Sequence, residues 1–232
     1  VRRVTAVRDT LRILKGLRPD AMLNYEGELY SLKNYQAEWA TQPAPRIYAG
    51  ATFSKMLRMA AGVADGTMMS DVPLQRMPEV MGWAGEGLAA SGRQRADFRM
   101  NNFMAWHVKE DRAAAIAEAR RELIWRGLLM SWFTELFLEP ADAAMVEAKR
   151  PAFLQAFLQR SAHIEGVPEP VIGKLVDNMT LTGDLRDIDR IAGHLKALEA
   201  AGLDEVALRL HDDPGEGLRL IGERLLPALE WT

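Results

Sequence analysis

Residues 45–71, PRIYAGATFSKMLRMAAGVADGTMMSD, constrain the fold of this chain more than any other stretch. A short apolar run at residues 46–49 predicts a buried strand, and the small residues at 50–52 predict a turn. A helix is predicted from residue 53 to about 63, followed by a second strand at 67–69. Because a helix that links two strands in this way joins parallel strands, the stretch predicts an α/β fold.

The turn between the first strand and the helix has the composition of an anion-binding turn. Gly50 and Ala51 carry little or no side chain, so a ligand can approach the backbone, and Thr52 and Ser54 add hydroxyl groups. The free N–H groups at the start of the following helix point toward the same place. Turns of this kind also occur in α/β proteins without a ligand, so the spacing alone leaves both interpretations open.

Composition excludes several functional classes. The chain has 232 residues, of which 26% are charged, and its net charge of −3 argues against a nucleic-acid partner. The lack of cysteine excludes disulfides and thiolate zinc sites, and it fits a cytoplasmic protein. No window approaches the ~18 apolar residues of a membrane-spanning helix, so we expect no membrane partner.

Helical periodicity dominates the rest of the chain. It predicts an amphipathic helix at residues 4–17, and a loop is predicted from 18 to 45. Further helices are expected near residues 77–91, 111–138, 141–157, 168–178, 187–200 and 217–229. Two more strands, at 99–108 and 205–210, bring the predicted strands to four, which are too few to close a barrel.

Residues 123–138, LIWRGLLMSWFTELFL, are the most apolar segment and are predicted to lie within a long helix. Apolar side chains cover most of that helix, and three interpretations are open: a helix buried in the core, a homodimer interface, or a lid over an apolar substrate. We expect the segment, with Trp125 and Trp132, to be buried against protein.

Candidates for catalysis and metal binding are few. The four histidines lie far apart, with no HxH or HExxH spacing, so no metal site is predicted. His107 ends a predicted strand and His211 follows another, although a surface histidine or one with satisfied hydrogen bonds is the favoured interpretation of each. Asp111 is predicted to cap a helix and Asp65 to lie in a turn. The sequence also contains no GxSxG, P-loop or GxGxxG motif, which argues against the corresponding enzyme classes.

Several segments resemble the luciferase-like monooxygenase superfamily. They are residues 45–71, the run EGLAASGR at 86–93, TGD at 182–184, LEAAGLDEV at 198–206, the opening of the chain at 1–11, and YEGELY at 25–30. The superfamily includes FMN-dependent monooxygenases and the reductases and dehydrogenases that use the deazaflavin coenzyme F-420. The run AGVADG at residues 61–66 is more similar to the F-420-dependent reductases than to bacterial luciferase.

This resemblance implies a (β/α)8 TIM barrel, of which these residues supply the later strands and helices. It implies one domain over residues 1–232, the C-terminal half to two-thirds of such a barrel, with a helical excursion at about 112–178. In the family, the residues near the reactive ring come largely from the early strands, so the resemblance assigns no catalytic residue here.

The resemblance also implies a cofactor site, for coenzyme F-420 or FMN. The positions that match the family's approach to the cofactor phosphate and side chain are Ala49, Gly50, Ala51, Thr52 and Ser54, and those that match the end of the next strand are Met68, Met69 and Ser70. The commoner Gly-Pro after the turn is replaced by Thr52-Phe53. The implied function is an oxidoreductase that acts on a small organic substrate; the alternative is a non-catalytic homologue or subunit that has lost the cofactor.

Overall fold

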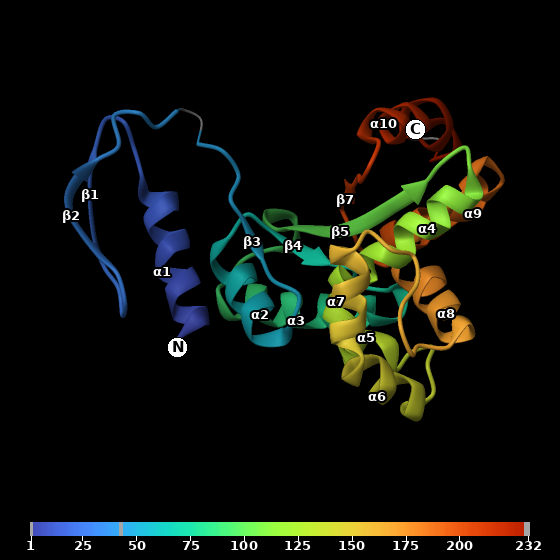
Figure 1. Ribbon diagram of the computed structural model, residues 1–232. Helices are drawn as coiled ribbons and strands as arrows, with labels where there is room; N and C mark the ends of the chain where they lie inside the picture. The colour runs from blue at the N-terminus through green and yellow to red at the C-terminus, as the bar shows by residue number, and fades with distance from the viewer. Residues whose placement is uncertain (1, 42–43, 230–232) are drawn as a thin grey trace. The chain divides into compact units, whose positions relative to one another are not determined.

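A computed structural model of the protein describes residues 2–41 and 44–229 (Figure 1). The chain divides into two compact units. The first unit holds the described residues up to Met69 together with residues 78–101. The second unit holds residues 70–77 and the described residues from Asn102 onward.

A five-stranded sheet confirms the predicted α/β class. Its strands are β3 (Tyr48–Gly50), β4 (Gly66–Ser70), β5 (Arg99–Val108), β6 (Leu181–Gly183) and β7 (Glu205–Arg209). They follow the order β3-β4-β5-β6, and β7 also pairs with β5. β3 runs parallel to β4, and β5 runs parallel to β6. Each predicted strand coincides with an observed one, β6 was not predicted, and the sheet does not close into a barrel.

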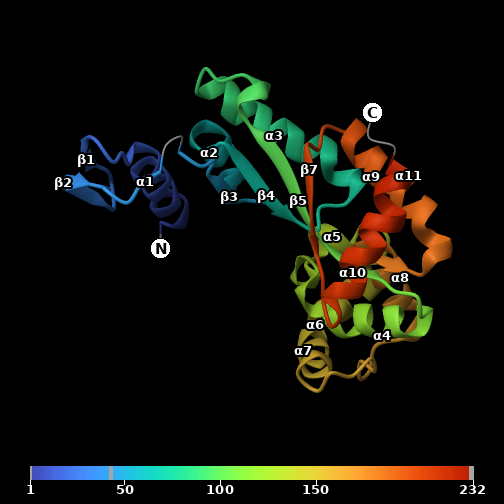
Figure 2. The same cartoon turned by 90° about the horizontal axis from the view of Figure 1, so that it is seen from above.

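The helices follow the predicted periodicity in most places. They are α1 (Arg3–Gly16), α2 (Ser54–Val63), α3 (Met77–Ala90), α4 (Arg112–Glu122), α5 (Ser131–Thr134), α6 (Pro140–Ala148), α7 (Arg150–Leu158), α8 (Glu169–Met179), α9 (Ile188–Ala200), α10 (Pro214–Leu220) and α11 (Leu226–Leu229). A π-helical segment at Ile221–Leu225 joins α10 to α11, and these C-terminal helices lie beside α9 (Figure 2).

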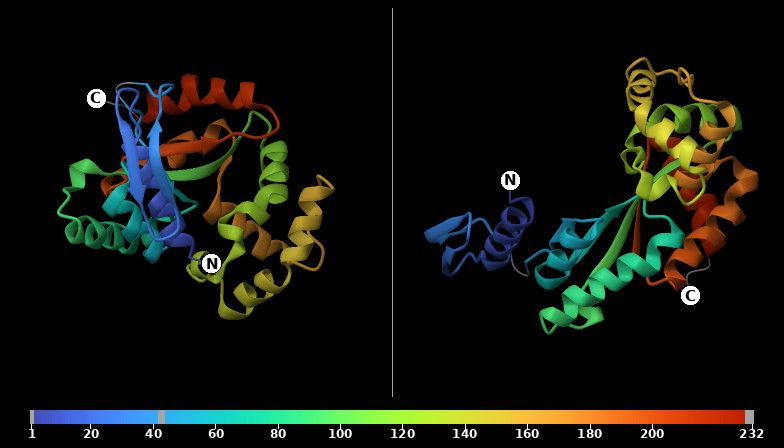
Figure 3. Two further views of the ribbon diagram at one scale, coloured as in Figure 1. Left: turned by 90° about the vertical axis from the view of Figure 1, so that its left-hand side faces the viewer. Right: turned by 90° about the horizontal axis from the view of Figure 1, so that it is seen from below.

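The prediction of a loop at residues 18–45 is wrong for residues 22–36. This region contains β1 (Met22–Glu26) and β2 (Ser31–Gln36), which form an antiparallel hairpin beside α1 (Figure 3). Residues 42–43 of the predicted loop lie outside the described residues. The buried carboxylate of Asp9 joins the two elements, because it accepts hydrogen bonds from Tyr25 Oη at 3.0 Å and from the backbone N–H of Leu29 at 2.9 Å. Apolar periodicity cannot reveal a hairpin that is anchored by a buried acid.

The strand–helix–strand stretch is held at its second turn by Asp65. Its carboxylate accepts a hydrogen bond from the Ile47 N–H at 2.9 Å and pairs with Lys15 Nζ on α1 at 2.6 Å. Asp65 is therefore the turn residue that the sequence predicted. Arg93 completes the turn by donating to the carbonyl oxygens of Ala61 and Ala64 at the end of α2.

The two long helices predicted for residues 111–138 and 141–157 are both broken. Residues 141–157 divide between α6 and α7, and α4 ends at Glu122. Beyond α4 lie two short 3-10 turns and α5, and Gly127, Leu128 and Leu129 all have positive φ angles near 50°. Leu123, Leu129 and Phe133 are buried in the helical core as predicted, but Trp125 and Leu128 are 39% and 53% exposed, which corrects the expectation of complete burial.

Candidate functional site

The turn after β3 is fixed by hydrogen bonds before any ligand binds. Thr67 of β4 is fully buried, and its Oγ1 lies 3.1 Å from the carbonyl oxygen of Ala49 and 2.9 Å from that of Ala51. The Ala51 N–H donates to the Met68 carbonyl oxygen at 3.2 Å. The backbone of residues 49–51 is therefore held against β4 by two groups of that strand, the Thr67 hydroxyl and the Met68 carbonyl oxygen.

The space in front of this turn is open. A Cβ atom built on the exposed Gly50 would meet no atom within 4 Å. α2 begins at Ser54, and its N-cap residue, Phe53, makes no side-chain cap hydrogen bond. The N–H groups of its first turn therefore keep hydrogen-bonding capacity for an anion, and the half-buried Ser54 adds a hydroxyl group.

The structure gives the predicted site residues different roles. Ala49 and Ala51 are buried, so they offer backbone atoms only. Met68 is exposed and touches the turn through its carbonyl oxygen, whereas the side chain of Met69 lies fully in the core because side chains alternate along a strand. Ser70, the exposed last residue of β4, belongs to the second unit.

Two histidines form a buried pair in the second unit. His107, near the end of β5, lies with its ring centroid 4.6 Å from that of His211, and their ring planes differ by 21°. Nδ1 of His107 is 2.7 Å from Glu118 Oε2, and Nδ1 of His211 is 3.5 Å from Glu122 Oε2. His107 is thus a core histidine with a carboxylate partner, as the favoured interpretation of the sequence held. The stacking on His211 was not foreseen.

Burial keeps both imidazoles neutral. It lowers the pKa of His107, an effect that Glu118 opposes. Burial, together with repulsion from His107, lowers the pKa of His211 to about 3. The Nε2 atoms of both rings are buried without a hydrogen-bond partner among the described residues.

An ion pair that sequence reasoning missed joins Asp71, the residue after β4, to the segment after α4. Asp71 accepts from Arg126 Nη1 at 3.0 Å and from the Gly127 N–H at 3.0 Å, and both side chains of the ion pair are almost fully buried. Burial raises the pKa of Asp71, and the positive charges of Arg126 and Arg209 oppose that rise. The available signal was the position of Asp71 directly after a strand, where α/β proteins place functional groups.

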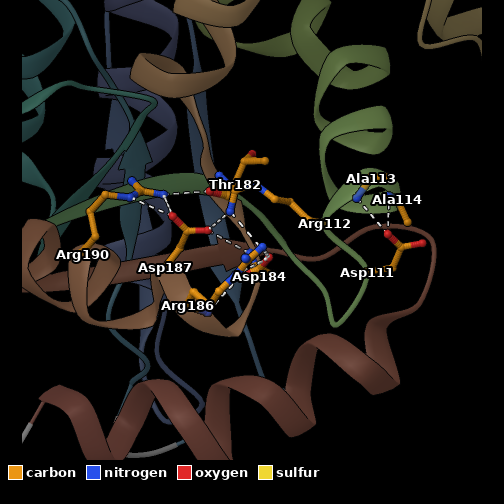
Figure 4. Close-up of polar contacts among 9 residues, drawn as sticks. All are labelled: Asp111, Arg112, Ala113, Ala114, Thr182, Asp184, Arg186, Asp187 and Arg190. Atoms are coloured by element: carbon orange, nitrogen blue, oxygen red, sulfur yellow. Dashed lines mark hydrogen bonds and ion pairs between the residues drawn. The ribbon is translucent and has the colours of Figure 1, made fainter.

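A second charged group surrounds the end of β6 (Figure 4). Asp184 and Asp187 cap each other's backbone, and Asp184 accepts from the backbone N–H of Arg186 at 2.9 Å and from its Nε at 3.1 Å. Arg112, the first residue of α4, pairs with Asp187, and Arg190 bridges Asp187 and the Thr182 carbonyl oxygen. Nearby, Asp111 caps α4 as predicted, accepting from the Ala113 and Ala114 N–H groups. Arg112, Arg186 and Arg190 all have carboxylate partners. We therefore interpret this group as structural: it connects the end of β6 to α4 and α9.

Within residues 2–41 and 44–229, no cluster of three or more histidine, aspartate or glutamate side chains could hold a metal ion. No helix in the same described ranges is long and apolar enough to cross a membrane.

Comparison with known proteins identifies relatives over nearly the whole chain. The 5,10-methylenetetrahydromethanopterin reductase of Archaeoglobus fulgidus is 26% identical over 227 residues, which cover 97% of this chain and 66% of the relative. The structure of the coenzyme F-420-dependent tetrahydromethanopterin reductase from Methanopyrus kandleri matches with a TM-score of 0.74 and 17% identity, over 98% of this chain and 64% of that chain. An F-420-dependent secondary alcohol dehydrogenase, solved with an F-420–acetone adduct, matches with a TM-score of 0.66 and 15% identity, over 97% and 62%.

The chain thus spans somewhat less than two-thirds of the length of these three proteins. The two structural matches establish the fold as that of luciferase-like TIM-barrel enzymes. Residues 2–205 match the family model for luciferase-like monooxygenases. This chain therefore belongs to the luciferase-like monooxygenase family.

Proposed function

We propose that the protein is an oxidoreductase that binds coenzyme F-420 or FMN with its phosphate at the turn of residues 49–54. One observation carries the proposal: a turn with a fixed backbone and open space at Gly50 precedes a helix whose N-cap residue, Phe53, makes no side-chain cap hydrogen bond. Family membership supports the same class of cofactor, and the F-420 dependence of the M. kandleri reductase and of the secondary alcohol dehydrogenase favours F-420.

The residues of the turn fit a phosphate group. A phosphate needs several donors and close access to the backbone, and the helix N-terminus, the Ser54 hydroxyl and the side-chain-free Gly50 provide both. Once bound, the cofactor would supply hydride transfer or oxygen activation. The chain's own part is to hold the phosphate and so to fix the position of the ring relative to a small organic substrate. A homodimer and a cytoplasmic location remain part of this proposal.

Cofactor titration of two turn variants tests the site. Gly50→Leu should abolish binding, because the leucine side chain occupies the approach to the backbone. Ser54→Ala should weaken binding by roughly 1 to 3 kcal/mol, the usual cost of losing a hydrogen bond to a charged oxygen. Gly85→Leu is the matched control, since Gly85 is also exposed with open space around it but lies on α3.

Fluorescence or absorbance titration with FMN and with coenzyme F-420 gives the affinities. Unchanged affinity in Gly50→Leu, for whichever cofactor the unmodified protein binds, would remove the turn from the cofactor site. Absence of binding to either cofactor by the unmodified protein would favour the alternative, a homologue that keeps the fold without the cofactor.

A further inference from the structure

Arg209 is an arginine without a counter-ion at the end of a strand. It is the last residue of β7 and is half-buried. Among the described residues, it makes no hydrogen bond or ion pair. Other arginines of the second unit with comparable or greater burial, such as Arg121 and Arg126, are each held by a carboxylate. A cation that is partly removed from water without a partner is costly, so its position requires an explanation.

The charges around Arg209 do not provide that partner. Arg209 is close enough to Asp71 and Arg126 to act on both: its charge favours the ionised form of Asp71 and disfavours that of Arg126. Asp71, however, already binds Arg126 and the Gly127 N–H. Two arginines therefore share the neighbourhood of one occupied carboxylate.

The other nearby acids are also occupied. Asp212 pairs with Arg121 and Arg160, at 2.7 Å in each case. Glu118 pairs with His107 and with Lys109 Nζ at 3.1 Å. Glu122, which acts on the charge of Arg126, lies 3.4 Å from Arg121 Nε and 3.5 Å from His211 Nδ1, and its Oε2 makes no hydrogen bond. Among the described residues, none of these acids forms an ion pair with Arg209.

Several nitrogen atoms close to Arg209 lack hydrogen-bond partners. Arg126 is only 1% exposed, yet its Nε–H has no acceptor. His211 follows Arg209 by two residues, and its Nε2 is also buried and unpartnered, like that of the stacked His107. The group thus combines an unpaired positive charge with one spare donor, the Nε–H of Arg126; the Nε2 atoms of the neutral imidazoles, whose Nδ1 atoms face carboxylates, are acceptors. It lies at the carboxyl end of β7, and α/β proteins bind ligands at the carboxyl ends of sheet strands.

We propose that Arg209, supported by the positive charge of Arg126, binds an anionic group of the substrate, a carboxylate or a phosphate. The guanidinium of Arg209 is the accessible member, and its planar fork matches two oxygens of such a group. The ligand anion would provide the counter-ion that Arg209 lacks among the described residues. This inference rests on the proposed function for the existence of a substrate, but it uses none of the residues of the turn at 49–54.

Inorganic phosphate is a suitable probe, because it binds without cofactor or turnover. Thermal unfolding midpoints are measured against phosphate concentration, with sodium chloride added to hold the ionic strength constant. Phosphate should raise the midpoint of the unmodified protein, since a ligand that binds only the folded state stabilises it. Arg209→Gln should weaken phosphate binding about 10- to 100-fold, as expected for the loss of charged hydrogen bonds. Arg209→Lys keeps the charge and should retain part of the effect.

Two further variants serve as controls. Arg224→Gln removes the same charge from an exposed position in the second unit, where the side chain has no partner among the described residues, and it should behave like the unmodified protein. Gly50→Leu blocks the turn at residues 49–54 but leaves Arg209 in place, so phosphate should still raise the unfolding midpoint of that variant. Loss of the rise in Gly50→Leu would place the bound phosphate at the turn. An equal midpoint rise in Arg209→Gln and the unmodified protein would overturn the inference, as would the absence of any rise.

Cofactor titration separates this site from the proposed function. Arg209→Gln should bind the cofactor with unchanged affinity, because the anion assigned to Arg209 belongs to the substrate. A loss of cofactor affinity in Arg209→Gln, with Gly50→Leu unaffected, would assign Arg209 to the cofactor and contradict the inference. Loss of cofactor binding in Gly50→Leu, with unchanged cofactor affinity in Arg209→Gln, would support both proposals: the cofactor phosphate at the turn and the substrate anion at Arg209.

Discussion

At the scale of single residues, the stacked pair of His107 and His211 shows how burial sets the charge state. Each imidazole faces a glutamate of α4, which would favour the protonated form, yet burial lowers the pKa of both rings. Two stacked imidazolium ions would also repel each other. The pair is therefore stable only when both rings are neutral, which makes the folded protein sensitive to acid.

Stability should fall as the pH is lowered through the range of free histidine. Because the folded-state pKa of His211 is about 3, below its ordinary value of 6.5, protons bind preferentially to the unfolded chain. The stabilisation is complete above the unfolded pKa and is lost as the pH falls toward the folded pKa. Each such histidine lowers the free energy of unfolding by up to about 1.4 kcal/mol per pH unit in this window.

Urea unfolding at a series of pH values from about 6.5 to 5 measures this slope. His211→Phe keeps an aromatic ring against His107 but cannot be protonated, so its slope should be smaller than that of the unmodified protein. His163→Phe is the control, because His163 is largely exposed and its slope should not change. An identical slope in His211→Phe and the unmodified protein would show that the buried pair does not titrate as described.

At the scale of elements, the segment after α4 shows where apolar patterning misleads. Eleven large apolar residues within residues 123–138 predicted a helix, but the chain forms a left-handed turn at Gly127, Leu128 and Leu129 instead. The cause lies outside the segment: Asp71, after β4, binds Arg126 and the Gly127 N–H. A buried ion pair to a residue far away in sequence leaves no trace in local periodicity.

Gly127→Ala should destabilise the protein through this turn. Gly127 has a φ of +53°, and a Cβ there would lie 2.5 Å from Phe133 Cδ2, so strain and overlap together should cost about 2 to 4 kcal/mol. Gly193→Ala is the matched control: Gly193 is exposed on α9 with open space around it, and alanine there should stabilise by up to about 1 kcal/mol. Chemical denaturation gives both values, and a loss in Gly127→Ala no larger than about 0.5 kcal/mol would disprove the strained turn.

Other elements were predictable because their signals are local. An apolar run, small residues and helical spacing predict the strand, turn and helix at residues 46–63. The observed bounds of β3 and α2 agree with the predicted ones to within two residues. Asp65 and Asp111 were identified from their turn and cap positions. The hairpin of β1 and β2 was missed because it depends on the buried Asp9, and β6 because three residues are too few to show a pattern.

At the scale of the whole molecule, the candidate site was only partly predictable. Residues 49–54 were found because composition and family resemblance agree on a short contiguous turn. Arg126, Arg209 and the histidine pair come together only through the pairing of β7 with β5 and the packing of α4, which no sequence window contains. Family membership fixes the fold, whereas the cofactor and substrate follow from individual side chains at the ends of strands.

The most direct test of the central claim is equilibrium dialysis of the protein against FMN and, separately, against coenzyme F-420. Bound chromophore is measured by visible absorption, since the two compounds have different spectra. We expect saturable binding of one of the two compounds, with a single molecule per chain. That binding should be lost in Gly50→Leu and retained in Gly85→Leu. Binding of neither compound, or equal binding by both variants, would contradict the central claim.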